Sequence, residues 1–207
     1  MEIKVEDAIK WFEKINEKIK LNKEYLTSLD QVIGDSDHGI NMARGFEEVV
    51  NKLSAKEYGT VSEVLKDAAM TLMSKVGGAS GPLFGTAFLR FSTAVKVKES
   101  VDFETFTLGL ESALEGVKHR GKSTAGEKTM IDVWSPVVDF FKRENDFQPD
   151  ELLYESRTAM ENTKEIMATK GRASYFKENS IGHIDPGAAS SYYIFEALAE
   201  VLQEGEK

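Results

Sequence analysis

The sequence contains no cysteine among its 207 residues, which excludes disulfide frameworks and thiolate metal sites. It also lacks any apolar run near the roughly 18 residues that a membrane-spanning helix needs, and its charged N-terminal segment does not resemble a signal peptide. Lysine and arginine (26) are outnumbered by aspartate and glutamate (35), and the net charge of −9 disfavours nonspecific binding to nucleic acid or an anionic membrane. We therefore expect a cytoplasmic protein that acts without nucleic acid or a membrane.

Proline is also scarce. The four prolines are scattered along the chain, and no serine- or glycine-rich linker divides it. With 41% hydrophobic and 29% charged residues, the composition is that of an ordinary globular protein. The chain length suits one sizeable domain, so we expect residues 1–207 to form a single domain.

Hydrophobic residues recur with a helical period along most of the chain. The clearest stripe runs from Val61 to Val76 with the spacing i, i+3, i+4, i+7. Weaker or shorter stripes occupy residues 5–19, 40–53, 84–95, 103–117, 130–141, 151–168 and 194–202. The alternation that is typical of strands is not evident. The sequence therefore predicts an all-α bundle of about eight helices.

Most of the 16 glycines are concentrated in four segments between the predicted helices. These segments, called glycine loops 1 to 4 below, cover residues 33–45, 77–85, 120–130 and 170–187. Glycine permits positive φ angles and lets backbone N–H groups approach a ligand closely. For any single loop, helix caps and tight turns are the favoured explanation. Four loops together favour a ligand site, and the fourth is much longer than a helix connection requires.

Glycine loop 1 follows Asp30 and carries Asp35 and Asp37. Asp35 and Asp37 are two positions apart, so an extended loop points both to the same side. Three crowded carboxylates repel one another unless a cation lies among them, and hard oxygen ligands of this number suit Mg²⁺. The spacing does not match an EF-hand, and a zinc site would need more histidine or cysteine. The alternative is that Asp35 or Asp37 only caps the following helix.

Glycine loops 2 and 3 each contain a sequence pattern that is associated with phosphate binding, but only the pattern in loop 2 lies in a suitable context. Residues 77–82 read GGASGP before an apolar helix, so Ser80 and the helix N–H groups either bind an anion or simply cap the helix. Residues 116–123 read GVKHRGKS and match the P-loop pattern. A P-loop lies between a strand and a helix, whereas residues 103–117 are helix-periodic. We therefore interpret Lys122 as a solvated loop cation or as one that meets phosphate in a geometry other than that of a P-loop.

Glycine loop 4 brings Arg172, His183 and Asp185 close together in the sequence. Arginine can bind a phosphate bidentately. Asp185 precedes the last predicted helix, where it could cap the helix or accept a hydrogen bond from a ribose hydroxyl. The four loops together predict a polyphosphate site at one end of the bundle. Neither the P-loop fold nor the dinucleotide-binding fold would supply such a site, because both require a parallel sheet.

Four long strings, in order, carry a resemblance to a known family: LDQVIGDSDHGINMARG, VGGASGPLFGTAF, GEKTMIDVWSP and KGRASYFKENSIGHIDPGAAS. Over about residues 5–203 the chain resembles the nucleotide-binding L subunit of dihydroxyacetone kinases. It departs from the family pattern at Glu127, where aspartate is expected, and at Ser36, where glycine or alanine is more usual.

The resemblance implies an antiparallel barrel of eight helices that is open at one end, where ADP or ATP binds with two Mg²⁺ ions. It implies that Asp30, Asp35 and Asp37 hold the metal, and it assigns no catalytic residue to this chain. The nucleotide contacts that it implies are His38, Gly39, Ile40, Asn41, Ala79, Ser80, Gly121, Thr129, Met130, Arg172, Asp185, Pro186 and Gly187.

The resemblance also implies a kinase activity that is divided among subunits. In the phosphotransferase-system type, a phosphohistidine on a carrier subunit phosphorylates bound ADP, and the γ-phosphoryl passes to dihydroxyacetone on a K subunit. Because this chain ends after one domain, we expect the K subunit and the phosphocarrier subunit to be separate partners. Two alternatives remain open: a nucleotide-sensing module that contacts a transcription regulator, and the nucleotide domain of an ATP-dependent or fatty-acid kinase.

Overall fold

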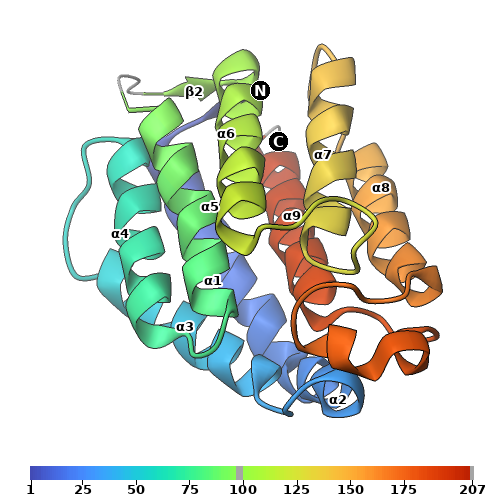
Figure 1. Ribbon diagram of the computed structural model, residues 1–207. Helices are drawn as coiled ribbons and strands as arrows, with labels where there is room; N and C mark the ends of the chain where they lie inside the picture. The colour runs from blue at the N-terminus through green and yellow to red at the C-terminus, as the bar shows by residue number, and fades with distance from the viewer. Residues whose placement is uncertain (97–99, 206–207) are drawn as a thin grey trace.

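The computed structural model describes residues 1–96 and 100–205, and most of this part of the chain is helical (Figure 1). The α-helices are α1 (Val5–Leu21), α2 (Lys23–Ile33), α3 (His38–Leu53), α4 (Val61–Lys75), α5 (Ser80–Ala94), α6 (Phe103–Gly121), α7 (Ile131–Arg143), α8 (Pro149–Asn162) and α9 (Pro186–Gly205). Two 3₁₀ segments, η1 (Thr163–Glu165) and η2 (Arg172–Ser180), connect α8 to α9. The all-α prediction is confirmed, with one antiparallel pair of two-residue strands, β1 (Glu2–Ile3) and β2 (Val101–Asp102), among the described residues.

Eight of these helices form a closed ring. From α3 to α9 each helix packs against the next one along the chain, and α1 closes the ring by packing against both α9 and α3. Helix α2 lies outside this ring and crosses one end of it, at the bottom of Figure 1. The predicted eight-helix barrel is therefore confirmed, and α2 is an additional helix that the hydrophobic stripes did not separate. No helix within residues 1–96 and 100–205 has the length and apolarity required to cross a membrane.

The ring helices alternate in direction, which brings four helix N-termini to the same end. Helices α3, α5, α7 and α9 all begin at the lower end in Figure 1, whereas α1 begins and α9 finishes at the opposite end. Each of these N-termini presents backbone N–H groups that have no partner within the helix, and the positive end of a helix dipole. The four glycine loops are the connections that enter these helices, so the predicted site residues converge there.

A buried aromatic cluster fills the opposite end of the ring. Trp11 packs edge-on against Phe88 and Phe91 with ring centroids 5.7 and 6.4 Å away, and Phe91 packs against Phe106 at 4.9 Å. The indole Nε1 of Trp11 donates to the carbonyl oxygen of Ile194 at 2.8 Å, which ties α1 to α9. Burying each such side chain contributes about 1.5–3 kcal/mol. This core holds the closed end of the ring and leaves loops to form the other end.

Candidate nucleotide and metal site

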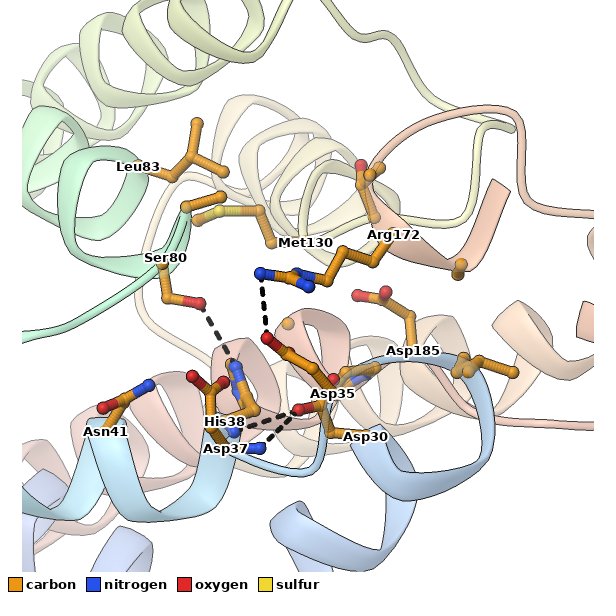
Figure 2. Close-up of a pocket in the computed structure, with 18 of the residues that line it drawn as sticks. Asp30, Asp35, Asp37, His38, Asn41, Ser80, Leu83, Met130, Arg172 and Asp185 are labelled. Carbon is orange, nitrogen blue, oxygen red and sulfur yellow. Dashed lines mark hydrogen bonds and ion pairs between the residues drawn. The ribbon is translucent and has the colours of Figure 1, made fainter. Parts of the chain in front are cut away.

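An open cavity with about 860 Å³ of empty volume lies where the four glycine loops meet (Figure 2). Its walls include most of the predicted site residues, namely Asp30, Asp35, Asp37, His38, Asn41, Ala79, Ser80, Thr129, Met130, Arg172, Asp185, Pro186 and Gly187. A second, more apolar hollow shares Ala79, Leu83, Thr129 and Met130 with this cavity and reaches Gly121. Segments that are far apart in the sequence therefore build one continuous depression.

Two of the predicted contact residues, Gly39 and Ile40, lie away from the described cavity wall. The side chain of Ile40 is 48% exposed on the outer surface of α3 near Lys20. Gly39 faces α2, where an added Cβ would lie 2.1 Å from the carbonyl oxygen of Lys23. Glycine is required there because α2 crosses α3 so closely. Contact of either residue with a nucleotide stays a prediction.

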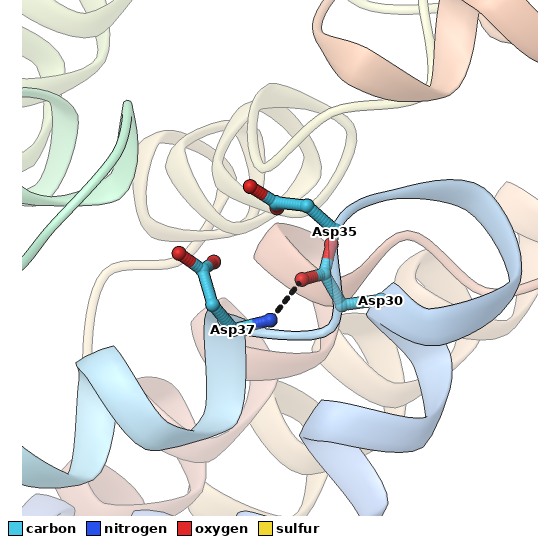
Figure 3. A group of neighbouring side chains, drawn as sticks. All are labelled: Asp30, Asp35 and Asp37. Carbon is cyan, nitrogen blue, oxygen red and sulfur yellow. Dashed lines mark hydrogen bonds between the residues drawn. The ribbon is translucent and has the colours of Figure 1, made fainter.

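The three aspartates lie together, and each offers one ligand atom within 4.8 Å of the others (Figure 3). Asp30 is buried, and its Oδ2 accepts the backbone N–H groups of Asp37 at 2.9 Å and His38 at 3.1 Å. These two hydrogen bonds fold glycine loop 1 back onto the end of α2. Asp35 and Asp37 project to the same side of the loop, as the sequence predicts.

The clustering of the three aspartates depends on the residues at positions 34 and 36 of glycine loop 1. A Cβ on Gly34 would lie 1.8 Å from Oδ1 of Asp30, so the carboxylate occupies the space that any side chain would take. Ser36 adopts a φ of 64°, a left-handed conformation that costs a residue other than glycine on the order of 1 kcal/mol. The positive φ at Ser36 explains why glycine suits this position.

The donor set fits Mg²⁺, because carboxylate oxygens are hard ligands and the cluster carries several negative charges. Arg172 approaches the cluster from glycine loop 4, with its Nη2 2.8 Å from Oδ2 of Asp35 (Figure 2). The arginine side chain is 65% exposed, so this pair is solvent-screened and contributes little to stability. Its effect is to bring a cation to the edge of the acidic cluster.

His38 is buried where α3, α5 and α9 meet. Its Nδ1 lies 3.2 Å from the hydroxyl of Ser80, and its Nε2 lies 2.7 Å from the hydroxyl of Ser190. Burial lowers the pKa of His38 to about 4 and outweighs the opposite effect of Asp30 and Asp37. A neutral imidazole therefore holds the Ser80 hydroxyl at the start of α5 without adding charge.

The end of α4, two residues before glycine loop 2, is held by Arg44, which the sequence analysis did not single out. Its Nε donates to the carbonyl oxygen of Lys75 at 3.2 Å, and its Nη2 donates to Oδ1 of Asn41 at 2.8 Å. Because the guanidinium occupies the amide oxygen, the amide NH₂ of Asn41 remains as a donor beside Gly77 and the cavity. Arg44 thus fixes both the end of α4 and the orientation of Asn41.

Glu127 connects glycine loop 3 to the start of glycine loop 4. Its carboxylate accepts the Thr124 N–H at 2.8 Å and the Ser123 hydroxyl at 2.8 Å, and it lies 3.3 Å from the Thr169 hydroxyl. These contacts, with the Thr124 N–H first, lower the pKa of Glu127. Glu127, one of the two positions at which the chain departs from the family pattern that it resembles, therefore has a structural role in the described residues.

Two further aspartates organise the loops beside the cavity. Asp132 accepts the N–H groups of Gly126 at 2.5 Å and Thr129 at 2.6 Å, which shapes the end of glycine loop 3. Asp185 accepts the N–H of Ala188 at 2.7 Å and so caps α9. Burial, together with a smaller effect of the nearby charge of Asp132, raises the pKa of Asp185 to about 7.

Lys122 lies at the C-terminal cap of α6 and is exposed, with a φ of 49°. The residues before it, from Phe103 to Gly121, are helical. The strand that a P-loop requires is thus replaced by a helix at this point, and the interpretation of the P-loop match as accidental is confirmed.

Comparison with known proteins gives consistent matches over most of the chain. The DAK2 domain family matches residues 32–200. The chain is 51% identical over 193 residues to the PEP-dependent dihydroxyacetone kinase 1, ADP-binding subunit DhaL, of Listeria innocua serovar 6a, covering 93% of this chain and 94% of that protein. It is 42% identical over 202 residues to the PEP-dependent dihydroxyacetone kinase, ADP-binding subunit DhaL, of Escherichia coli, covering 95% and 96%.

A solved structure has the same fold. The dihydroxyacetone kinase from C. freundii, crystallised in complex with AMP-PNP and Mg²⁺, superposes with a TM-score of 0.71. The match covers 97% of this chain and 34% of that one at 22% sequence identity. The likeness at this identity concerns the arrangement of the helices.

Proposed function

The chain belongs to the DAK2 domain family, and from this premise we propose that it is the ADP-binding subunit of a phosphoenolpyruvate- and phosphotransferase-system-dependent dihydroxyacetone kinase. In this proposal a phosphohistidine carrier phosphorylates bound ADP, and the γ-phosphoryl passes to dihydroxyacetone on a separate K subunit. The observation that carries the proposal is the 51% identity to an ADP-binding subunit over nearly the full length of both chains. The cavity with three clustered aspartates supports it.

Asp30, Asp35 and Asp37 are the residues that would hold the metal, and we expect two Mg²⁺ ions among them and the phosphates. Bound Mg²⁺ supplies neutralisation of phosphate charge and orients the transferred group. Asp30 positions the metal ligands before the ion binds. Its carboxylate accepts two backbone N–H groups, one of which belongs to Asp37. Arg172 adds a positive charge at the edge of the cluster.

The remaining cavity residues suit the two ends of a nucleotide. Ser80 and the N-terminus of α5 offer donors to phosphate oxygens, and the amide of Asn41 lies on the same wall. The apolar hollow beside Gly121 and Met130 suits the adenine ring. Phosphoryl transfer depends mainly on positioning and charge stabilisation. We assign no general base to this chain, since both nitrogens of the neutral His38 are occupied by serine hydroxyls.

The nucleotide content of the purified protein tests the binding part of the proposal. We expect ADP to remain after dialysis against Mg²⁺ buffer at close to one per chain. Asp37→Asn should lower the affinity for Mg²⁺-ADP by about a hundredfold or more, because it removes a charged ligand without changing side-chain shape. Asp139→Asn, at an exposed position on α7, is the matched control and should retain ADP. Equal ADP content in all three proteins would contradict the metal assignment.

Reconstitution tests the reaction itself. The purified chain, mixed with a K subunit, the phosphocarrier proteins and phosphoenolpyruvate, should convert dihydroxyacetone to its phosphate, and omission of the chain should abolish the product. Absence of product, together with binding to a transcription regulator, would favour the sensing role instead.

A further inference from the structure

Glycine loop 3 contains a buried lysine that the proposed function does not use. Lys128 is 1% exposed and adopts a φ of 62°. Its Nζ donates to the carbonyl oxygens of Thr163 at 2.5 Å and Ile166 at 3.2 Å, and also to that of His183. An ammonium group has three hydrogens, so the main chain uses all of them and none remains for a phosphate.

These three acceptors lie at the two ends of the connection between α8 and α9. Thr163 and Ile166 are at its beginning, in and just after η1, and His183 is near its end, two residues before Asp185. Lys128 therefore joins the beginning and the end of this long connection through one buried ammonium group. Lys128 itself, the next residue Thr129 and Asp185, which is two residues beyond His183, all line the cavity.

Burying an ammonium group is unfavourable unless it is well paired. Burial lowers the pKa of Lys128, and the charges of Asp185, Asp132 and Glu165 oppose that change. An apolar side chain would fill the same space without this cost. The lysine therefore contributes something other than packing, and its hydrogen bonds show what it does: they fix irregular backbone that has few helical hydrogen bonds of its own.

A second tie runs from the neighbouring residue to the middle of the same connection. Thr169 donates its N–H to the carbonyl oxygen of Glu127 at 3.3 Å, and its hydroxyl lies 3.3 Å from the Glu127 carboxylate. The next residues, Lys170 to Arg172, line the cavity. Glu127 and Lys128 thus hold the beginning, the middle and the end of the 163–185 segment. Arg172 and Asp185 of this segment face the cavity in Figure 2.

We propose that Lys128 is a positioning residue that holds the 163–185 segment against the cavity and thereby slows the release of bound nucleotide. This inference rests on the proposed function, since it requires a nucleotide in the cavity. A segment already ordered before binding loses less conformational entropy when the ligand arrives, and it must be displaced before the ligand leaves. Lys128 itself has no free donor for the phosphates, so it acts through Arg172 and Asp185.

The test is the dissociation rate of a fluorescent ADP analogue with Mg²⁺, chased by excess ADP. Lys128→Met keeps the unbranched stem and removes the three donors, and we expect dissociation to accelerate about tenfold or more. Lys128→Arg, which keeps a charged donor, should recover part of the slow release. The matched control is Lys122→Met, because Lys122 lies in the same loop with the same left-handed backbone but is exposed, and its rate should equal that of the wild type.

Glu127→Gln provides a second variant that does not alter a buried position. It weakens the tie to Thr169 and should accelerate release by a smaller factor, at unchanged helix content by circular dichroism. Slow release from the wild type together with wild-type rates for both Lys128→Met and Glu127→Gln would overturn the inference and leave the proposed function intact. If Lys128→Met does not fold, the rate of Glu127→Gln alone decides. A wild-type protein that binds no nucleotide would instead overturn the proposed function and the inference together.

Discussion

Asp185 combines two roles that favour different protonation states. As the cap of α9 it accepts the N–H of Ala188 at 2.7 Å, which favours the carboxylate. Burial has the larger effect and raises the pKa of Asp185 to about 7, with Asp132 acting in the same direction and Lys128 in the opposite one. The carboxyl group is therefore partly protonated at neutral pH in the nucleotide-free protein.

This shift makes the stability of the protein depend on pH. The unfolded chain releases the Asp185 proton near pH 4, whereas the folded chain keeps it until about pH 7. The contribution of Asp185 to the free energy of unfolding should therefore fall as pH rises from 4 to 7 and then level off. Asp185→Asn can still cap α9 but cannot ionise, so its free energy of unfolding should gain roughly 2–4 kcal/mol relative to the wild type over this range.

Urea unfolding of metal-free and nucleotide-free protein at several pH values measures this difference. Asp139→Asn serves as the control, because Asp139 is exposed on α7 and the same Asp-to-Asn change is made there. The curves of wild type and Asp185→Asn running parallel from pH 4 to 7 would show that the carboxyl group is ionised throughout.

At the scale of elements, the sequence predicts the helices and the loops well. The stripe from Val61 to Val76 corresponds to α4. This helix packs against α3 and α5, and such packing requires an apolar face. The glycine loops include the connections at one end, for two reasons. At Gly34 and Gly81 an added Cβ would collide with neighbouring atoms, whereas Gly78, Gly126, Gly171 and Gly182 adopt positive φ angles. These features are local, so a local pattern reveals them.

The interactions that hold the loops together are the part that the sequence does not reveal. From the sequence, Lys128 and Arg44 would be expected to be exposed, because lysine and arginine are mostly surface residues. Their acceptors are carbonyl oxygens of segments up to 55 residues away, and every residue has a carbonyl group. Helix α2 is similar, because it follows α1 after a single residue and only its crossing over α3 separates it. Such contacts depend on the tertiary structure.

Glycine loop 1 provides a prediction about an element. In Gly34→Ala the added Cβ would lie 1.8 Å from Oδ1 of Asp30 and 2.9 Å from the carbonyl oxygen of Asp30, so it would collide with both. Either Asp30 rotates away from the loop N–H groups or the loop shifts, and we expect a loss of about 1–3 kcal/mol in unfolding free energy. Mg²⁺-dependent ADP affinity should fall at least about tenfold, measured by isothermal titration calorimetry.

The control is Gly59→Ala, because the nearest atom to a Cβ at Gly59 is 3.6 Å away and belongs to the flexible Glu63 side chain. Its stability should change by less than about 0.5 kcal/mol and its ADP affinity should not change. Undiminished affinity in Gly34→Ala would mean that the position of the Asp30 carboxylate is not needed for metal binding.

For the whole molecule, the alternating ring separates the source of stability from the site of binding. The aromatic cluster lies at one end, and the other end consists of loops around three acidic side chains. Four helix N-termini face this acidic end and offset part of its charge. The loop end is therefore the part of the fold that a bound cation and nucleotide stabilise most, because they neutralise repulsion and add contacts among the four loops.

This separation predicts that ligand removal lowers the melting temperature of the whole ring. Ligand at a hundred times its Kd contributes about 2.7 kcal/mol to folding stability, and a domain of this size changes its Tm by about 2–4 °C per kcal/mol. Stripping Mg²⁺ and ADP with chelator and dialysis should therefore lower the Tm by about 5–10 °C in differential scanning calorimetry. Restoring ADP without Mg²⁺ should recover only a small part of this loss, because the aspartates and the phosphates then repel each other. In Asp37→Asn the stripped and loaded samples should melt at nearly the same temperature, and a full Tm increase in that variant would mean that the ligand binds elsewhere on the ring.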